Sequence, residues 1–337
     1  MTSASRPKVL FICGSMNQTT QLHQVAQAFP ECEARFTPYY GDRTVTAMRR
    51  LGLIEISIGG NKRRGWCLDY LRAQDLTIDL DGKRGDCDLV VGCTDMVVPK
   101  NVRKNRLVMV QEGILDPEGF VFRLVKRFRF LPRWYAGTAT TGMSNLYARY
   151  CVASEGYRQH FIRNGADPAK IVATGIPNFD DCQRFYANDF PHRGYVLVCT
   201  SDTRETGKID FRKRFLRRAV AIAKGRRLVF KLHPNESLAR CTREISSIAP
   251  DALIFQQGSA EEMIANCDVL ITQWSSTVFV GMALGKEVHT NFDKDELAKL
   301  APIQNGATSA KNIADVCREV LSMPKLRERE RAIEVRA

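Results

Sequence analysis

Two short apolar runs in this 337-residue chain end in polar groups that are suited to binding phosphate. Residues 228–235 place His233 directly after the first run, and residues 270–277 end in the hydroxyl side chains of Ser275, Ser276 and Thr277. Apolar runs that stop abruptly at polar residues are typical of buried parallel strands with a site at their carboxyl ends. A helical pattern begins at Thr277, and the free N–H groups of a first helical turn favour an anion. The two runs therefore predict a phosphate site.

These runs belong to a regular alternation of strand and helix patterns. The first half has strand-like runs at 9–13, 89–92, 107–110, 150–153 and 171–173, and the second half has them at 195–199, 228–232, 253–256, 270–272 and 287–290. Short strands with helices between them predict an α/β fold with mainly parallel sheets. A polar segment at 188–193 interrupts the alternation. We therefore expect an N-terminal domain of residues 1–188, a C-terminal domain of residues 189–325 and a charged helical tail of residues 326–337.

Composition indicates an ordinary globular protein of the cytoplasm. The chain is 44% hydrophobic and 26% charged, and it has no apolar run long enough to span a membrane. Residues 1–8 lack the apolar core of a signal peptide. The eleven cysteines are scattered without a CxxC pair, which favours free thiols in a reducing compartment over a disulfide framework.

The formal net charge of +13 calls for an anionic partner. No zinc finger, helix-turn-helix or RNA-binding aromatic motif is present, so we do not expect nucleic acid as the partner. The segment from Arg123 to Trp134 mixes cations with large apolar side chains. This pattern suits either a solvated helix with a core-facing stripe or a patch that binds an anionic membrane surface or a lipid-linked acceptor.

The His-Pro at residues 233–234 and the hydroxyl pair before a helix resemble GT-B glycosyltransferases, most clearly over residues 225–290. The resemblance is closest to CDP-glycerol glycerophosphotransferases and to capsule sialyl- and Kdo-transferases. It implies a GT-B fold of two doubly wound Rossmann-like domains facing a cleft, with acceptor binding in the first and nucleotide-donor binding in the second. It also implies that His233, Ser275, Ser276 and Thr277 bind the donor phosphate. That family often has Asp-Tyr before the serines, where this chain has Gln273-Trp274.

In the same resemblance, the catalytic base lies at the end of an N-terminal strand. Kdo-transferases have an acidic residue before glycine there, and the matching position in this chain is Glu112, before Gly113. Thr200, Ser201 and Thr206, after the first strand of the second domain, could complete the phosphate or base pocket. The Asp-x-Asp pattern at residues 79–81 lacks the context of a metal-dependent transferase, so no metal is expected.

The resemblance therefore predicts an inverting, metal-independent glycosyltransferase or glycerophosphotransferase of cell-surface polysaccharide or glycoconjugate synthesis. It would need no cofactor, because a nucleotide-activated sugar or CDP-glycerol is its co-substrate and a glycan or lipid-linked molecule its acceptor. We expect it in the cytoplasm, with peripheral association at the inner face of the membrane as a further expectation. The sequence leaves open the donor sugar, the nucleotide base, the acceptor and the oligomeric state.

Residues 174–178 and the Leu-Gly-Lys at 284–286 resemble a different group of the same fold, the UDP-N-acetylglucosamine 2-epimerases. Those enzymes carry a Glu-Glu pair just before the Leu-Gly-Lys, where this chain has only apolar residues and glycine at 279–283. An enzyme similar to these epimerases is the alternative. A non-catalytic basic protein that binds polyanions is a further alternative.

Overall fold

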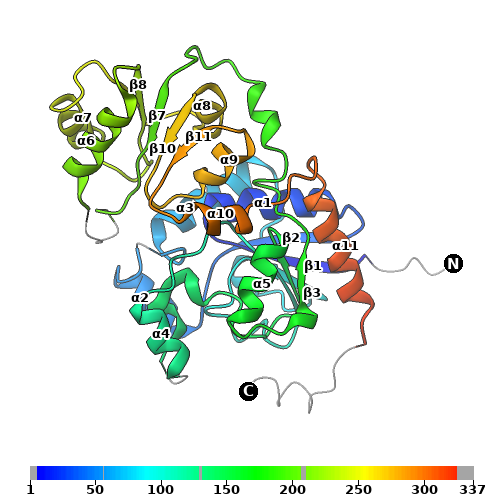
Figure 1. The fold of residues 1–337 in the computed structure, drawn as a ribbon. Helices are drawn as coiled ribbons and strands as arrows, with labels where there is room; N and C mark the ends of the chain where they lie inside the picture. Colours follow the sequence, from blue (N-terminus) through cyan, green and yellow to red (C-terminus); the bar gives the residue numbers. More distant parts are fainter. Residues whose placement is uncertain (1–5, 56, 129–130, 206–209, 325–337) are drawn as a thin grey trace. The chain divides into compact units, whose positions relative to one another are not determined.

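The chain folds into two compact α/β units in a computed structural model that describes residues 6–55, 57–128, 131–205 and 210–324 (Figure 1). The first unit comprises residues 1–180 and 305–337, and the second comprises residues 181–304. Each unit is built around a parallel sheet with connecting helices. The expected α/β class, with two doubly wound Rossmann-like units of the GT-B type, is confirmed.

The first unit has a six-stranded sheet in the order β2-β1-β3-β4-β5-β6, with every neighbouring pair parallel. Its strands are β1 (Lys8–Cys13), β2 (Glu33–Pro38), β3 (Leu89–Gly92), β4 (Arg106–Val110), β5 (Arg149–Val152) and β6 (Ile171–Ala173). Its helices are α1 (Met16–Gln27), α2 (Arg43–Arg50), α3 (Asn61–Ala73), α4 (Phe120–Arg127), α5 (Glu155–Arg163) and α11 (Ser309–Ser322), with short 3-10 turns η1 (Leu80–Gly82), η2 (Arg133–Thr140) and η3 (Pro168–Lys170). Strands β1, β3 and β4 are almost wholly buried, as continuous apolar runs require.

The second unit has a five-stranded parallel sheet in the order β11-β10-β7-β8-β9. Its strands are β7 (Val196–Cys199), β8 (Leu228–Lys231), β9 (Leu253–Phe255), β10 (Val269–Ile271) and β11 (Glu287–His289). Its helices are α6 (Arg212–Ala223), α7 (Leu238–Ser246), α8 (Ala260–Asn266), α9 (Thr277–Ala283) and α10 (Lys294–Leu300), and a 3-10 turn η4 (Cys182–Tyr186) leads into it. Residues of β7, β8 and β10 form its core together with α6 and α7.

The strand order of each unit reverses direction once, and that point is where open α/β sheets bind ligands. In the first sheet the reversal lies between β1 and β3, because β2 lies on one side of β1 and the later strands lie on the other. In the second sheet it lies between β7 and β10. The residues after the carboxyl ends of these strands are therefore the first candidates for function in each unit.

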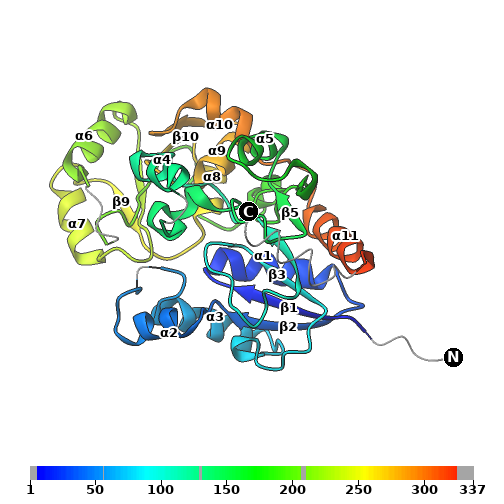
Figure 2. The ribbon, with the colours of Figure 1, turned by 90° about the horizontal axis from the view of Figure 1, so that it is seen from below.

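The C-terminal helix α11 packs in the first unit, although the sequence analysis assigned residues 189–325 to the second domain. It lies beside α1 in both views (Figures 1 and 2). The carbonyl of Thr174 accepts hydrogen bonds from the amides of Asn305 and Asn312, each at 3.2 Å, and the backbone N–H of Ser309 donates to Asp180 at 2.9 Å. The segment 174–180 therefore anchors the returning chain.

Gly175 has a positive φ of 75°, and a Cβ there would collide with the Ser309 side chain, so only glycine fits this anchor. The expected helical tail at 326–337 and Thr206 lie outside the described residues. Within the described ranges, no helix is both long and apolar enough to cross a membrane.

Candidate functional site

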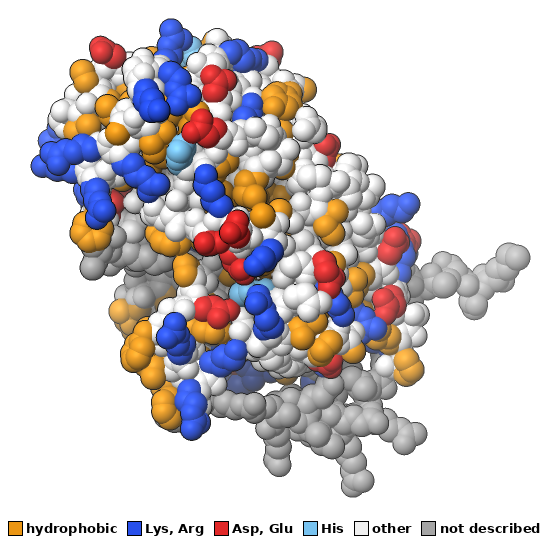
Figure 3. Space-filling model, in the orientation of Figure 1, with side chains coloured by type: hydrophobic (Ala, Val, Ile, Leu, Met, Phe, Trp, Pro, Cys, Tyr) orange, Lys and Arg blue, Asp and Glu red, His pale blue; other side chains and the backbone are white. Residues whose placement is uncertain are grey.

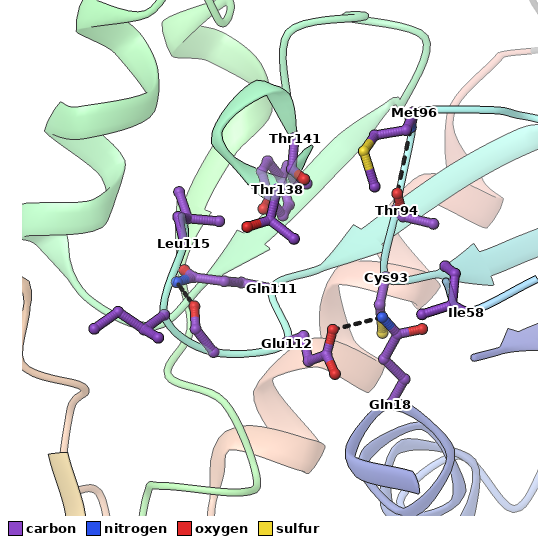
Figure 4. Close-up of a pocket in the computed structure, with 13 residues that line it drawn as sticks. Gln18, Ile58, Cys93, Thr94, Met96, Gln111, Glu112, Leu115, Thr138 and Thr141 are labelled. Atoms are coloured by element: carbon purple, nitrogen blue, oxygen red, sulfur yellow. Dashed lines mark hydrogen bonds between the residues drawn. The ribbon is translucent and has the colours of Figure 1, made fainter. Parts of the chain in front are cut away.

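A small pocket lies at the carboxyl ends of β3 and β4 in the first unit (Figure 4). It offers about 60 Å³ to water-sized molecules, enough for a few waters or a small polar group. Its lining combines one carboxylate with several hydroxyl and amide groups: Gln18, Thr94, Gln111, Glu112, Thr138 and Thr141, with Ile58, Cys93, Met96, Gly113, Ile114, Leu115 and Tyr150 completing the wall. The predicted base Glu112 is thus a wall of this pocket.

Both carboxylate oxygens of Glu112 accept hydrogen bonds from the start of α1. The Ser15 hydroxyl donates to Oε1, and the Gln18 amide donates to Oε2 at 2.6 Å, as Figure 4 shows for Gln18. Ser15 is also the N-cap of α1, because its hydroxyl accepts the backbone N–H of Gln18 at 3.1 Å. The two donors therefore fix the orientation of the carboxylate.

Gly14 precedes this cap and leaves room for the Gln18 side chain. A Cβ at position 14 would collide with the Gln18 amide oxygen. The sequence analysis did not single out Ser15 or Gln18. The available signal was a serine followed three residues later by glutamine, the capping-box pattern.

The turn that carries Glu112 is fixed by its buried neighbour Gln111. The Gln111 side chain accepts the backbone N–H of Ala153 at 2.9 Å and donates to the carbonyl of Gly113 at 2.8 Å. Its own carbonyl accepts the side-chain amide of Gln21 at 2.8 Å. These bonds tie the turn that carries Glu112 to the residue after β5 on one side and to α1 on the other.

The opposite wall of the pocket is organised by Asp95, whose side chain is fully buried. It accepts the backbone N–H groups of Gly142 and Ser144, each at 2.8 Å, and pairs with Arg133 at 3.0 Å. These contacts hold the segment that bears Thr138 and Thr141. Arg133, which the sequence placed in a basic segment, is therefore neutralised inside the fold.

Cys93 contributes a neutral thiol to the pocket. Burial, with a smaller contribution from the negative charge of Glu112, raises the pKa of Cys93 well above its usual value. A protonated thiol is a weak nucleophile, so Cys93 serves as an apolar part of the wall.

In the second unit, His233 lies just beyond the end of β8, with its side chain 38% exposed. Its Nδ1 accepts the backbone N–H of Asn235 at 3.2 Å and lies 3.7 Å from Oδ2 of Asp202. The Asn235 amide donates to the same Asp202 oxygen at 2.8 Å. Because Nδ1 accepts, the neutral ring carries its proton on Nε2, the form that donates a hydrogen bond from that atom.

The loop that carries His233 rests on a buried ion pair. The His233 backbone N–H donates to Glu236 at 3.0 Å and to the Thr200 hydroxyl at 3.2 Å, and Thr200 in turn donates to Glu236. Glu236 pairs with Arg212 at 3.0 Å, and both side chains are about 97% buried, with 3% exposure each. The Thr200 hydroxyl therefore supports the loop, and the Ser201 hydroxyl is bonded to Thr203 at 2.7 Å.

The hydroxyl residues after β10 form a compact turn at the start of α9. Ser275 Oγ accepts the backbone N–H of Thr277 at 3.3 Å and the Thr277 hydroxyl at 3.0 Å. Ser276 is the N-cap residue, and its side chain makes no capping hydrogen bond. Since β10, β7 and β8 are neighbours in one parallel sheet, Ser275, Thr200 and His233 all follow the same edge of that sheet.

The acidic pair near η1 has structural partners. Asp81 pairs with Arg64 at 3.0 Å, and Asp79 accepts the backbone N–H of Arg84 at 3.3 Å. In the described part of the chain, no group of three or more His, Cys, Asp and Glu side chains could hold a metal ion.

No protein-family model matches the chain, and no curated protein sequence matches it. Solved structures do match over nearly the whole chain. UDP-GlcNAc 2-epimerase from Neisseria meningitidis, bound to UDP-GlcNAc, has a TM-score of 0.58 at 12% identity, covering 93% of this chain and 99% of that one. The Methanocaldococcus jannaschii UDP-GlcNAc 2-epimerase, in complex with UDP-GlcNAc and UDP, has a TM-score of 0.53 at 14% identity, covering 95% and 94%. UDP-N-acetylglucosamine 2-epimerase from Rickettsia bellii gives 0.54 at 10%, covering 94% and 96%. At these identities the likeness establishes the fold.

The comparisons correct the predicted function. The expectation of an inverting glycosyltransferase or glycerophosphotransferase is wrong, because these whole-length neighbours are 2-epimerases, and they favour the alternative reading. They share the GT-B fold but do not belong to the glycerophosphotransferase and capsule-transferase group that the motifs resemble. The physical reason is that polar residues at a strand end report phosphate binding and do not specify what happens to the sugar.

Proposed function

We propose that this chain is a nucleotide-sugar enzyme that inverts carbon 2 of a UDP-N-acetylhexosamine without an acceptor. The observation that carries the proposal is the Glu112 carboxylate, held by Ser15 and Gln18 beside a pocket at the strand ends of the first unit. The fold is that of 2-epimerases whose solved structures contain UDP-GlcNAc.

Inversion at carbon 2 requires that its C–H bond be broken and remade on the other face. No carbonyl lies next to that carbon, so the electron pair needs another place to go. It can form a double bond to carbon 1 while the C1–O bond to UDP breaks and UDP leaves with that bond's electrons. Return of the proton from the other face and of UDP to carbon 1 completes the inversion. This route needs a base near carbon 2 and stabilisation of the departing diphosphate.

The first unit would supply the base. Glu112 is the acidic residue of its pocket, and two hydrogen bonds fix the plane of its carboxylate. A positioned carboxylate contributes typically 10²–10⁴-fold to a proton transfer. The Ser15 hydroxyl, which donates to Glu112, helps to hold that carboxylate in place.

The second unit would bind the diphosphate. His233 presents its Nε2–H, and the serine hydroxyls after β10 add further polar groups at the same sheet edge. Hydrogen bonds to a charged oxygen are about twice as strong as neutral ones, so they favour the leaving diphosphate over the bound ester.

The chain lacks the Glu-Glu pair of the epimerases, so the contacts that this pair makes in those enzymes are not assigned to this chain. The positions that hold a Glu-Glu pair in those enzymes fall in α9, where Phe279 and Val280 are buried in the core. The sugar or ribose must therefore be bound by other groups in this chain. The half-exposed ring of Trp274, packed edge-on against Phe292, is placed after β10 and could stack on a ring of the ligand.

We place the protein in a reducing compartment. All eleven cysteines are free thiols and ten of them are buried. Burial raises the pKa of most of these thiols, including Cys151 to about 12, which keeps them protonated.

The test is deuterium exchange at carbon 2. UDP-GlcNAc is incubated with the protein in D₂O without an acceptor, and proton NMR follows the carbon 2 signal. The wild type should exchange that proton and form the epimer, whereas Glu112→Gln should do so about 10²–10⁴-fold more slowly. Glu118→Gln serves as the control, because Glu118 instead accepts a hydrogen bond from the Asn164 amide and does not line the pocket. Tight UDP binding without any exchange would refute the epimerase proposal.

A further inference from the structure

Helix α4 carries two apolar faces, and only one of them is used inside the fold. Phe122 and Val125 are buried against the first unit. Phe120 and Val121 are 74% and 47% exposed, and Leu124 is half-buried. Their spacing of one and four residues puts these three side chains on one stripe of the helix. The outer stripe therefore presents large apolar side chains to the surroundings.

Cations flank this outer stripe. Arg123 and Arg127 are exposed, and α4 contains no acidic residue. The turn η2 contacts α4 and adds Trp134 and Tyr135, both about half exposed. Their rings stack with the ring centroids 4.0 Å apart. Figure 3 shows hydrophobic side chains interspersed with Lys and Arg where Figure 1 places α2 and α4. Phenylalanine, tryptophan and tyrosine beside arginine are the combination found on helices that lie in the plane of a membrane surface.

We infer that the outer stripe of α4, with Arg123, Arg127 and the η2 aromatics, docks the protein on an anionic lipid surface. The apolar side chains enter the boundary between headgroups and acyl chains, and the arginines bind lipid phosphates at the level of the headgroups. The net charge of +13 adds a long-range attraction of the same sign. This docking surface is independent of the proposed epimerase chemistry, because none of its residues lines the Glu112 pocket.

A second copy of the chain fits this stripe less well than lipid. In a two-fold dimer the same patch meets itself, so the arginines of both copies would approach one another. The helix offers no carboxylate to compensate them. An anionic membrane supplies both the apolar medium and the opposite charge.

The experiment measures sedimentation of the full chain with vesicles of equal parts phosphatidylcholine and phosphatidylglycerol, against pure phosphatidylcholine vesicles. The wild type should bind the anionic vesicles far more tightly, and binding should weaken as salt rises. Each basic side chain strengthens such binding about five-fold, so Arg123→Gln/Arg127→Gln should weaken it roughly 25-fold. Phe120→Ser/Val121→Ser should weaken it about tenfold through lost apolar burial.

Helix α6 provides matched controls. It exposes Phe211 at its N-cap and Val220, 69% and 37% exposed, but these lie nine residues apart and so on opposite sides of the helix. It also exposes Arg214 and Arg217. Phe211→Ser/Val220→Ser and Arg214→Gln/Arg217→Gln should therefore change vesicle binding by less than about twofold to threefold.

Several results would overturn the inference. One is that the wild type binds the two vesicle types equally. Another is that both α4 variants bind anionic vesicles as tightly as the wild type, and a third is that the α4 and α6 variants lose equal amounts of binding. A dimer in light scattering that Phe120→Ser/Val121→Ser dissociates would assign the stripe to a second copy instead. Circular dichroism and UDP binding of each variant, compared with wild type, would show that a lost interaction does not reflect unfolding.

Discussion

In both units, polar residues follow the carboxyl ends of parallel strands, but the accessible groups at these two polar edges differ in their chemistry. In the first unit the edge presents a carboxylate, Glu112, which accepts two hydrogen bonds from α1. In the second unit the carboxylate of Glu236 is buried and paired with Arg212, and the exposed group is the imidazole of His233. One edge is therefore suited to take up a proton, and the other to donate hydrogen bonds to an anion.

The difference teaches that burial decides the role of an acid at a strand end. Glu112 is only partly buried, lines a pocket and accepts its hydrogen bonds from neutral donors, so it remains accessible to a ligand. Glu236 is fixed by a guanidinium and supports the loop of His233 through its backbone N–H. A charge held in a buried pair is costly to disturb.

The largest expected effect tests the acid of the first unit. Glu112→Gln keeps the shape of the side chain and removes its basicity, so exchange at carbon 2 should fall by about 10²–10⁴-fold. UDP affinity, measured by calorimetry, should stay within about twofold, because diphosphate binding is assigned to the second unit. A parallel loss of UDP affinity would show that the two edges do not divide the work in this way.

The next effect tests the acid of the second unit. Arg212→Met leaves Glu236 buried without its partner, which should lower the free energy of unfolding by about 3–5 kcal/mol. Arg212→Met/Glu236→Leu should recover much of that loss, because no buried charge remains. Urea denaturation measures both variants. A loss below about 0.5 kcal/mol for Arg212→Met would mean that Glu236 is not a fixed structural charge.

A smaller effect tests the imidazole. His233→Ala removes one hydrogen bond to a charged oxygen and should weaken UDP binding by about tenfold to a hundredfold. The control is His289→Ala, since His289 instead pairs with Glu287 at 2.7 Å on β11. Calorimetry with UDP compares the two. Equal affinities in wild type and His233→Ala would remove His233 from the phosphate site.

The fold followed from the sequence where local pattern decides structure. The apolar runs at β1, β3, β4 and β10 predicted buried parallel strands, and the structure has them there. Strand β2 was missed because its sequence is mixed in polarity. It includes Arg35, whose side chain is buried only because Glu33 and Asp86 pair with it. No local pattern contains that compensation.

The features that the sequence did not predict depend on contacts between residues far apart in the chain. The return of α11 to the first unit depends on contacts such as that of Arg149 with Glu319 at 2.7 Å, between residues far apart in sequence. The same holds for Ser15 and Gln18, which contact Glu112 from 97 and 94 residues away in the sequence. The motifs at His233 and Ser275 predicted a phosphate site but carried no information on the fate of the sugar, and the predicted reaction was wrong for that reason.

The smallest expected effect concerns the helix that orients Glu112. His23 on α1 is buried, and its Nδ1 lies 3.0 Å from the Tyr70 hydroxyl with the Phe36 ring edge-on. Burial lowers the pKa of His23 below its usual value of 6.5. At pH values just below 6.5, the His23 imidazole therefore binds a proton more readily in the unfolded chain than in the folded one. The contribution of His23 to stability is complete above pH 6.5 and is lost as the pH falls below it.

The measurement is the free energy of unfolding between pH 7.5 and pH 5.5, in wild type and His23→Gln, over a window that brackets the reference pKa of histidine. The wild type should lose stability on acidification, and His23→Gln should lose less. Ser15 caps α1 and Gln18 lies in it, so both donors to Glu112 depend on this helix. As the pH falls, we therefore expect the polar edge of the first sheet to lose its structure before that of the second. If the free energy of unfolding depended on pH in His23→Gln as it does in the wild type, the packing of α1 would not depend on a neutral imidazole.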